Sequence, residues 1–379
     1  MNSLHNFLGA FTQILQGQLF PALEEELGPL NALHRAFVRA LGLLQLEGFT
    51  ARRQGAGRPA HDRASIARAF LAKAVFNVPH TRALLDRLAH DVALRRLCGW
   101  ECAAQLPDES VFSRAFAEFA RSEFGQRVHA AVIERTQSER LVWHILRDST
   151  AIEAREKPAP KKPAPEERPR RAHRKAGTVK RPEQMTRLDR QASGAMTLGE
   201  MLAELPRACD TGCKPSSKGT RHFWNGYKLH LDVADGQIPI SCVLTSASLN
   251  DSQAAIPLAL ISAARVTSFY DLMDAGYDCQ AIREHSRSLG HVPLIPCQKR
   301  GAAEAAEMAP HEKARYRERT AAERVYARLK DEFGGRCVRV RGAAKVMTHL
   351  MFGILALTAD QILRWSGAAP PPDGSPAPA

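Results

Sequence analysis

The sequence predicts an α/β protein, in which a mixed five-stranded sheet flanked by helices follows an all-helical N-terminal region. Three observations lead to this fold class. Apolar residues recur at helical spacing through the first 140 residues. From residue 141 the pattern changes to short apolar runs that are typical of buried strands. After residue 249 helical and strand patterns alternate, as they do in α/β domains.

The helical pattern of the first part runs through LHRAFVRALGLLQLEGF, SIARAFLAKAVF and HTRALLDRLAHDVALRRLCGW, with polar breaks between them. Asp62 precedes the second pattern, where its carboxylate is expected to cap the first turn. Short helices with interspersed arginines suit a DNA-binding region of helix-turn-helix type, and a plain helical bundle has the same pattern. We expect residues 1–140 to form a helical DNA-binding or dimerisation region.

The sheet is expected within residues 141–366. A three-stranded meander followed by alternating helices and strands predicts a mixed sheet. The expected strands are 141–148, 223–235, 238–249, 268–274 and 292–297, and the expected helices are 251–264, 278–288, 312–332 and 343–364.

A basic insertion separates the first two expected strands. Residues 155–190 contain six prolines, and 13 Lys or Arg against five Asp or Glu. Such a segment buries too little apolar surface to offset the entropy lost on ordering. We therefore expect disorder at 153–192, as a DNA-contacting arm or a mere linker, and a disordered tail at 367–379.

The charge of the whole chain favours polyanionic partners. Its 379 residues carry 53 Lys and Arg against 40 Asp and Glu, a net charge of +13. Apolar residues make up 44% and exclude wholesale disorder, while only 6% aromatics argue against a stacking surface for single strands. The longest apolar stretch, 350–365, contains Asp360 and is too short to span a membrane. The N-terminus lacks a secretory signal, so the expected compartment is the cytoplasm.

Two aspartates stand at the ends of expected strands. Asp148 closes the strand 141–148, and Asp274 closes the strand 268–274 just before a glycine turn. Carboxylates at strand ends pack poorly and are good ligands for hard cations. If these two strands are neighbours, both carboxylates meet at one edge of the sheet.

Other aspartates remain candidates for the second acid. Asp278 could replace Asp274, and so could Asp232 or Asp251, although Asp251 is placed to cap a helix. Asp271 lies in the middle of an expected strand and is predicted to be a surface residue.

The helix expected at 312–332 provides a third acid. Tyr316, Arg319, Glu323 and Lys330 fall on one helical stripe about 60° wide, at 100° per residue. Such a stripe presents a carboxylate flanked by donors suited to phosphate, or it is an exposed face of i, i+4 ion pairs. Three carboxylates from separate elements suit two divalent ions ~3.5–4 Å apart, and hard oxygen ligands favour Mg²⁺ or Mn²⁺.

The spacing Tyr316-x2-Arg319-x3-Glu323-x6-Lys330 resembles the Y-(2)-R-(3)-E-(6)-K motif of bacterial insertion-sequence DDE transposases of the IS-four type. Asp148 in RDST resembles the family's first acid, and Asp274 in DAGYD resembles its second. The segment 57–116 is similar to the helical N-terminal region of many such transposases. The stretch 292–305 lacks the Trp with which some relatives hold a flipped base during hairpin formation.

The resemblance implies a ribonuclease H-like catalytic domain that cuts DNA at transposon ends and joins the freed 3′-hydroxyl to a target. It implies that Asp148, Asp274 and Glu323 ligate two Mg²⁺ (or Mn²⁺) ions. By the same resemblance, Tyr316, Arg319 and Lys330 contact the transposon end. Expected partners are double-stranded DNA and a second copy of the chain on that DNA, in the bacterial nucleoid and without a membrane. A non-mobile ribonuclease H-like nuclease and a domesticated DNA-binding protein are the alternatives.

Overall fold

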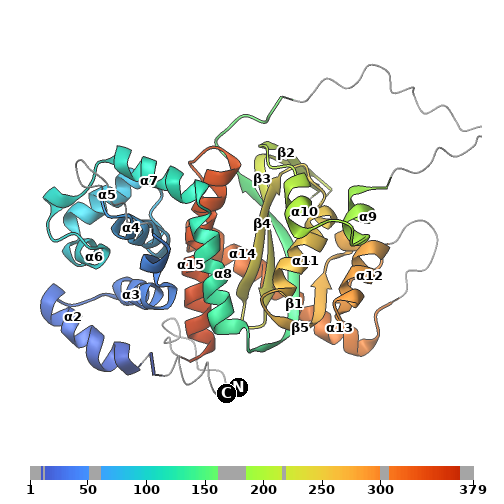
Figure 1. Ribbon diagram of the computed structural model, residues 1–379, viewed down its shortest axis with the longest axis horizontal. Coiled ribbons are helices and arrows are strands. Elements are labelled where there is room, and N and C mark those ends of the chain that lie inside the picture. The colour runs from blue at the N-terminus through green and yellow to red at the C-terminus, as the bar shows by residue number, and fades with distance from the viewer. Residues whose placement is uncertain are drawn as a thin grey trace, which may run out of the picture.

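The computed structural model describes residues 10–11, 13–50, 61–160, 185–215, 219–298 and 307–367. The long helix α15 (Ala343–Trp365) lies between a helical region and an open sheet that is flanked by helices (Figure 1). Both halves of the predicted fold class are therefore confirmed. The central part of the basic insertion (161–184) and the tail (368–379) lie outside the described residues.

The helical region is built from short helices. Asp62 caps α4 as predicted, because its carboxylate accepts hydrogen bonds from the backbone N–H groups of Ala64 at 3.2 Å and Ser65 at 2.8 Å. The helices are α2 (Phe20–Leu27), α3 (Ala32–Leu44), α4 (Arg63–Val75), α5 (Thr81–His90), α6 (Val92–Cys98), α7 (Glu109–Arg121) and α8 (Phe124–Gln137).

Among the described residues the sheet has six strands rather than five. They are β1 (Leu141–Glu153), β2 (Asp210–Pro215), β3 (Arg221–Ala234), β4 (Ile238–Ser246), β5 (Thr267–Met273) and β6 (Val292–Leu294). The order is β2-β3-β1-β5-β6, and β4 also pairs with β3. β1, β3 and β4 form the predicted antiparallel meander, while β5 and β6 continue the sheet in parallel from β1.

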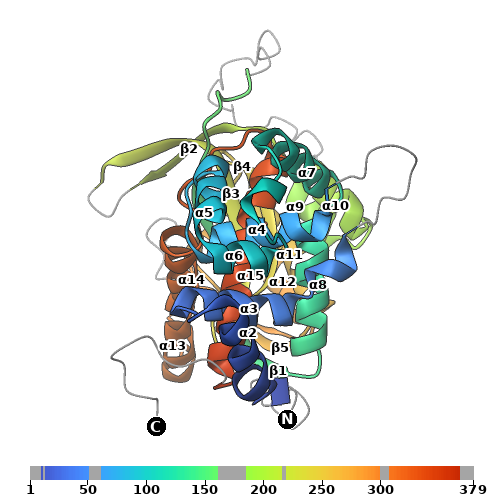
Figure 2. The ribbon, with the colours of Figure 1, turned by 90° about the vertical axis from the view of Figure 1, so that its left-hand side faces the viewer.

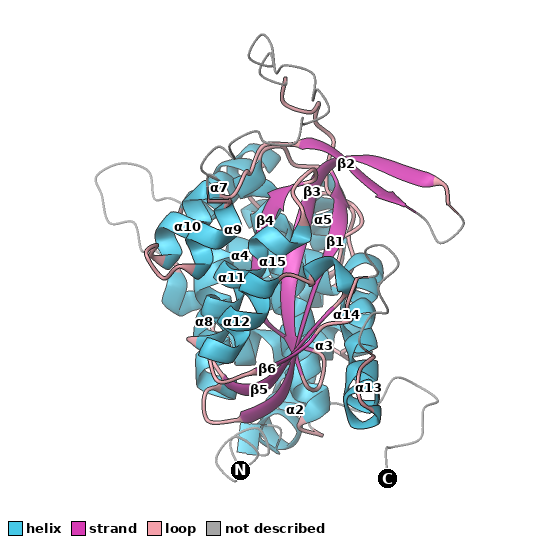
Figure 3. Cartoon of the chain, turned by 90° about the vertical axis from the view of Figure 1, so that its right-hand side faces the viewer, coloured by secondary structure: helices cyan, strands magenta, loops and turns pink. Residues whose placement is uncertain are grey.

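The additional strand β2 pairs with the first half of β3, from Arg221 to Gly226. Its sequence, DTGCKP, has no run of apolar residues, so nothing in the pattern predicted a strand. Together β2 and β3 form a hairpin that projects from the body on the same side of the sheet as α13 and α14 (Figures 2 and 3).

Helices cover the two faces of the sheet (Figure 3). On one side lie α9 (Arg187–Ala192), α10 (Leu198–Glu204), α11 (Ala255–Ala263) and α12 (Gln280–Ser288). On the other side lie α13 (Pro310–Tyr316) and α14 (Thr320–Asp331), which are separated by the 3₁₀ turn η6 (Arg317–Arg319). The single helix predicted at 312–332 is therefore interrupted at η6.

One predicted boundary was wrong at the end of the insertion. Residues 187–192, expected to be disordered, form α9. A capping box between Thr186 and Asp189 begins this helix, and Leu188 is buried against the sheet-side core. Local capping and one apolar anchor therefore override a composition that is polar overall.

The core helix α15 connects the two halves of the molecule. By length and composition α15 could cross a membrane, but 89% of its apolar window is buried inside the protein. It packs against α3, α4, α7 and α8 on one side and against β4 on the other. A single apolar core therefore continues from the helical region into the sheet.

Candidate active site

The register of β1 and β5 brings two carboxylates together. The last pair of this parallel ladder is Arg147 with Met273, so Asp148 and Asp274 are the next residues on neighbouring strands. The two carboxylates were expected to meet if their strands were neighbours, and β1 and β5 are neighbours. Asp148 does not end its strand, however. β1 continues to Glu153 because it remains paired with β3, while β5 stops.

Asp148 is held by its own strand and by α14. The backbone N–H of Ser149 donates to its carboxylate at 2.9 Å. The buried hydroxyl of Tyr326 on α14 donates to its carbonyl oxygen and accepts the backbone N–H of Leu231 at 3.0 Å. Tyr326 thereby fixes α14 against β1 and β3. Tyr326 was not among the predicted site residues, although it lies one turn after Glu323 on the apolar face of the helix.

Asp274 occupies the turn that follows β5. Its carboxylate caps the 3₁₀ turn η5 (Ala275–Tyr277) by accepting the backbone N–H of Gly276 at 2.8 Å. A Cβ atom at position 276 would lie only 2.9 Å from Oδ1 of Asp274. The glycine of the DAGYD segment therefore leaves room for the carboxylate.

Arg319 links Asp148 and Glu323. Its guanidinium lies 3.3 Å from Oδ2 of Asp148 and 3.4 Å from Oε1 of Glu323. The side chain of Glu323 is 62% exposed, whereas those of Asp148 and Arg319 are mostly buried. Tyr316 is half-buried beside the same guanidinium, and burial raises the pKa of its hydroxyl.

The electrostatics of Asp148 are those of a crowded, desolvated carboxylate. Burial raises its pKa to about 6, and the negative charge of Asp274 adds to this effect. Arg319 and the N–H of Ser149 oppose it. A cation held between the two aspartates would favour their charged forms, as Arg319 already does in part.

The interrupted helix still presents its four predicted residues toward β1. Tyr316 ends α13, Arg319 lies in η6, and Glu323 and Lys330 lie on α14. The ammonium of Lys330 donates to the hydroxyl of Thr150 at 2.7 Å. Because strand side chains alternate, Thr150 lies on the same face of β1 as Asp148. All four residues therefore line the face of β1 that carries Asp148.

The rival acids are occupied elsewhere. Asp251 forms an ion pair with Lys228 at 2.8 Å, and Asp278 pairs with Arg283 at 2.8 Å. The predicted cap at Asp251 is wrong, because the neighbouring Asn250 makes that hydrogen bond.

Asp232 is fully buried behind the site. Nε and Nη2 of Arg147 donate to its two carboxylate oxygens, each at 2.8 Å. Asp271 is only 1% exposed, accepts the hydroxyl of Ser286 at 2.6 Å and pairs with His291 at 3.2 Å. The prediction of a surface position for Asp271 is therefore wrong. Its strand, β5, has parallel neighbours on both sides and helices above it.

The three carboxylates are ligands that suit a hard divalent cation, but they are too far apart to share one ion. Asp148, Asp274 and Glu323 offer only carboxylate oxygens, which suit Mg²⁺ or Mn²⁺. In the part of the chain that the structure describes, no three His, Cys, Asp or Glu side chains are close enough to share a metal ion. Arg319 lies between Asp148 and Glu323, so a shared metal requires this guanidinium to move.

Comparisons with known proteins agree with this geometry. Residues 202–359 match the family model described as a transposase DDE domain, and residues 25–118 match a second model described as a transposase domain (DUF772). The first match includes Asp274 and Glu323 and begins after Asp148. No curated protein and no solved structure matches the chain. With a helical region and a ribonuclease H-like sheet in the corresponding segments, the chain belongs to the DDE transposases of insertion sequences, enzymes that cleave DNA and transfer its strands.

Proposed function

We propose that Asp148, Asp274 and Glu323 are the acids with which this transposase cleaves the ends of its own insertion sequence and joins them to target DNA. The observation that carries the proposal is the position of Asp148 and Asp274, side by side where β5 ends, facing the helix that bears Glu323. Two Mg²⁺ or Mn²⁺ ions bound there would activate the attacking oxygen and stabilise the leaving one.

Arg319 has two positions in this proposal. In the free protein it neutralises Asp148 and Glu323. When a cation takes over that role, the guanidinium is released toward the DNA, where its planar fork suits two oxygens of one phosphate. Tyr316 and Lys330 lie on either side of it along the helix and contact the same strand near the scissile phosphate.

The path of the DNA follows the face of the sheet that carries α13 and α14. The β2–β3 hairpin projects over this side (Figure 2) and carries exposed basic residues, Lys214, Arg221 and His222. The described part of the hairpin has a carboxylate only at its base, Asp210. A two-stranded ribbon of this charge fits the major groove of a duplex. We infer that the helical region 1–140 and the basic insertion bind further along the same DNA.

The oligomeric state and the cellular location that we propose follow from the reaction. Two transposon ends must be brought together, so we propose a homodimer on DNA, in the cytoplasm where the nucleoid lies. The catalytic domain in this proposal spans 141–366, although its core is continuous with the helical region through α15. The IS-four subtype rests on the Tyr316–Lys330 spacing alone.

Cleavage of the element's own end DNA, with and without Mg²⁺, tests this proposal. Asp274→Asn should abolish strand cleavage, while Asp278→Asn, four residues on and paired with Arg283, is the matched control and should retain it. Cleavage of any duplex with no preference for the ends would instead indicate the non-mobile nuclease. End binding without cleavage at any Mg²⁺ or Mn²⁺ concentration would indicate a domesticated DNA-binding protein.

A further inference from the structure

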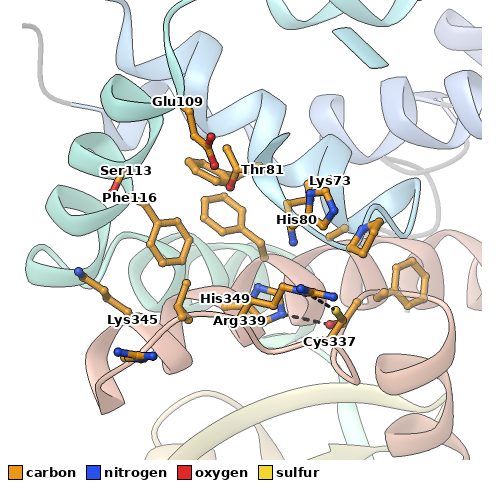
Figure 4. A pocket seen from close by; sticks show the side chains of 18 residues that line it. Lys73, His80, Thr81, Glu109, Ser113, Phe116, Cys337, Arg339, Lys345 and His349 are labelled. Carbon is orange, nitrogen blue, oxygen red and sulfur yellow. Dashed lines mark hydrogen bonds between the residues drawn. The ribbon is translucent and has the colours of Figure 1, made fainter. Parts of the chain in front are cut away.

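A cavity of about 570 Å³ opens between the helical region and the segment that joins α14 to α15. Helices α4, α5 and α7 line one side, and residues 333–341 with the first turns of α15 line the other (Figure 4). The rings of Phe70, Phe116 and Phe352 form its apolar wall. None of the three predicted catalytic acids lines it.

Cations dominate the polar lining of this cavity. Lys73 comes from α4, Arg339 and Arg341 from the connecting segment, and Lys345 from α15. Glu109 is the carboxylate at the rim, and it faces Arg82 at 3.6 Å. Across the described ranges none of the four cations forms an ion pair with a carboxylate. Arg339, Arg341 and Lys345 are exposed to solvent, whereas Lys73 is mostly buried, and an anion in the cavity would reduce the repulsion among these four charges.

The partners of the two arginines are weak or neutral. Nε of Arg339 donates to the sulfur of Cys337 at 3.4 Å, and Nε of Arg341 donates to the carbonyl oxygen of Arg155 at 3.1 Å. The remaining donors of Arg339, on the edge of the cavity, leave a guanidinium fork available for a planar or tetrahedral oxyanion.

Lys73 carries the largest electrostatic cost. Its side chain is mostly buried in α4, and burial lowers the pKa of its ammonium to about 8. Cys337 opposes this shift and Arg339 adds to it. A buried ammonium without a counter-ion is costly, and an anion in the cavity would relieve that cost.

From this geometry we infer that the cavity is a binding site for a phosphoryl group, with Lys73 and Arg339 as its principal ligands and Lys345 at its entrance. An oxyanion fits a cavity lined by cations, and the phenylalanine wall gives room for the organic part of a nucleotide. The phosphoryl group belongs to the DNA backbone or to a free nucleotide. The inference does not depend on the roles of the three acids.

Two hydrogen bonds connect the lining of the cavity to the residues that follow the strand of Asp148. Besides the bond from Arg341 to Arg155, the backbone N–H of Gly342 donates to the carboxylate of Glu156 at 3.0 Å. The strand runs five residues from Asp148 to its end at Glu153, about 17 Å, or about five base pairs of B-DNA at 3.4 Å each. Arg155 and Glu156, which follow this end, contact the segment that lines the cavity.

The charge of the site depends on pH through Lys73. The groups around this ammonium are Arg339 and Cys337 from the connecting segment, His349 from α15, His80 just before α5 and Glu109 from α7. Burial lowers the pKa of His349 to about 4, so this histidine is neutral at pH 7. Phosphate binding should therefore weaken as the pH rises from about 8 to 9.5, where phosphate is already a dianion and Lys73 loses its proton.

Binding of inorganic phosphate and of a 20-base-pair duplex to the full chain tests the inference. Lys73→Met keeps the apolar stem, and Arg339→Gln keeps two donors. Each should weaken phosphate binding, duplex binding or both at least tenfold. Arg287→Gln, which removes an exposed cation of α12 on the far side of the sheet, is the control and should change neither more than twofold.

The outcomes separate the two sources of the phosphoryl group. Loss of duplex affinity alone in Lys73→Met and Arg339→Gln places a backbone phosphate in the cavity. If the variants lose affinity for both the duplex and inorganic phosphate, the cavity also binds free phosphate. Unchanged affinities in both folded variants would overturn the inference, and so would phosphate binding that does not weaken toward pH 9.5. Thermal unfolding in the absence of phosphate checks that the variants are folded. Lys73→Met should raise the melting temperature, because it removes a buried charge.

Discussion

The guanidinium of Arg319 lies 3.3 Å from the carboxylate of Asp148, so a cation of the helix side neutralises the first acid of the sheet. The same guanidinium reaches Glu323 at 3.4 Å. Arg319 thus occupies the space between two acids that the proposed reaction must bring onto the same metal. The free protein holds these acids near each other and protects them from mutual repulsion.

Arg319→Gln should separate metal binding from catalysis. Without the competing guanidinium, the free protein should bind Mn²⁺ about 3- to 10-fold more tightly, a change of about 0.6–1.4 kcal/mol. DNA cleavage should nevertheless become slower, because the phosphate contact is lost. Titration of Mn²⁺ by electron paramagnetic resonance measures the affinity. Weaker Mn²⁺ binding in this variant would show that Arg319 does not compete with the metal.

Arg147→Met should destabilise the sheet behind the site. The variant leaves the fully buried Asp232 without the two hydrogen bonds from Arg147, although the one from Ser262 remains, and this should cost about 3–5 kcal/mol of unfolding free energy. The double variant Arg147→Met with Asp232→Leu removes both charges and should recover most of the loss. Urea unfolding of the three proteins checks this. Equal stability of the single and double variants would mean that the pair carries no such cost.

Gly226→Ala should disturb the junction of β1 and β3. Gly226 has a φ of +150°, and a Cβ atom there would lie 2.1 Å from the carbonyl oxygen of Ile152. Because this neighbour is backbone, the loss should be about 3 kcal/mol or more. Gly199→Ala in α10 is the control, since a Cβ atom there has no neighbour within 4 Å and should stabilise the helix by about 0.5–1 kcal/mol. Thermal unfolding that shifts equally in both variants would contradict this account.

Three buried histidines should make the fold sensitive to mild acid. Burial lowers the pKa of His129 to about 3, of His230 to about 4 and of His349 to about 4. Below the unfolded value near 6.5 the unfolded chain binds protons that the folded chain does not, so stability falls as the pH falls. At pH 5.5 each histidine should lower the free energy of unfolding by about 1.4 kcal/mol, compared with a pH at which it is neutral in both states.

Denaturant unfolding at pH 7.5 and pH 5.5 measures this loss, which should be about 4 kcal/mol for the three histidines together. His349→Gln can keep the hydrogen bond to the carbonyl of Gly334 but cannot titrate, so its loss should be about one third smaller. The same loss in the variant and the parent protein would exclude His349 as a contributor.

Local patterns predicted most of the elements because their apolar spacing is strong. The meander, the alternating second half and the cap at Asp62 follow from residues close in sequence. The hairpin strand β2 was missed because its sequence has no run of apolar residues, and it forms a strand by pairing with Arg221–Gly226. The interruption at η6 was missed because the residues 317–319 are as compatible with an α-helix as their neighbours.

The candidate site was predicted only as far as strand adjacency allowed. Asp148 and Asp274 were expected to meet only if their strands were neighbours, a condition that the pattern left open and that the pairing of β1 with β5 fulfils. The burial of Asp271 and the support from Tyr326 depend on tertiary contacts that span 20 and 178 residues, which no local pattern reports. The roles of the six predicted site residues in DNA cleavage remain predictions.

The most direct test of the account is the rate of Mg²⁺-dependent end cleavage by Asp148→Asn, measured beside its affinity for the same end DNA. Cleavage should fall at least 10³-fold, a loss of about 4 kcal/mol of transition-state stabilisation, while end binding changes less than about threefold. Cleavage by Asp148→Asn at the rate of the unaltered protein would show that Asp148 is not a metal ligand in the reaction.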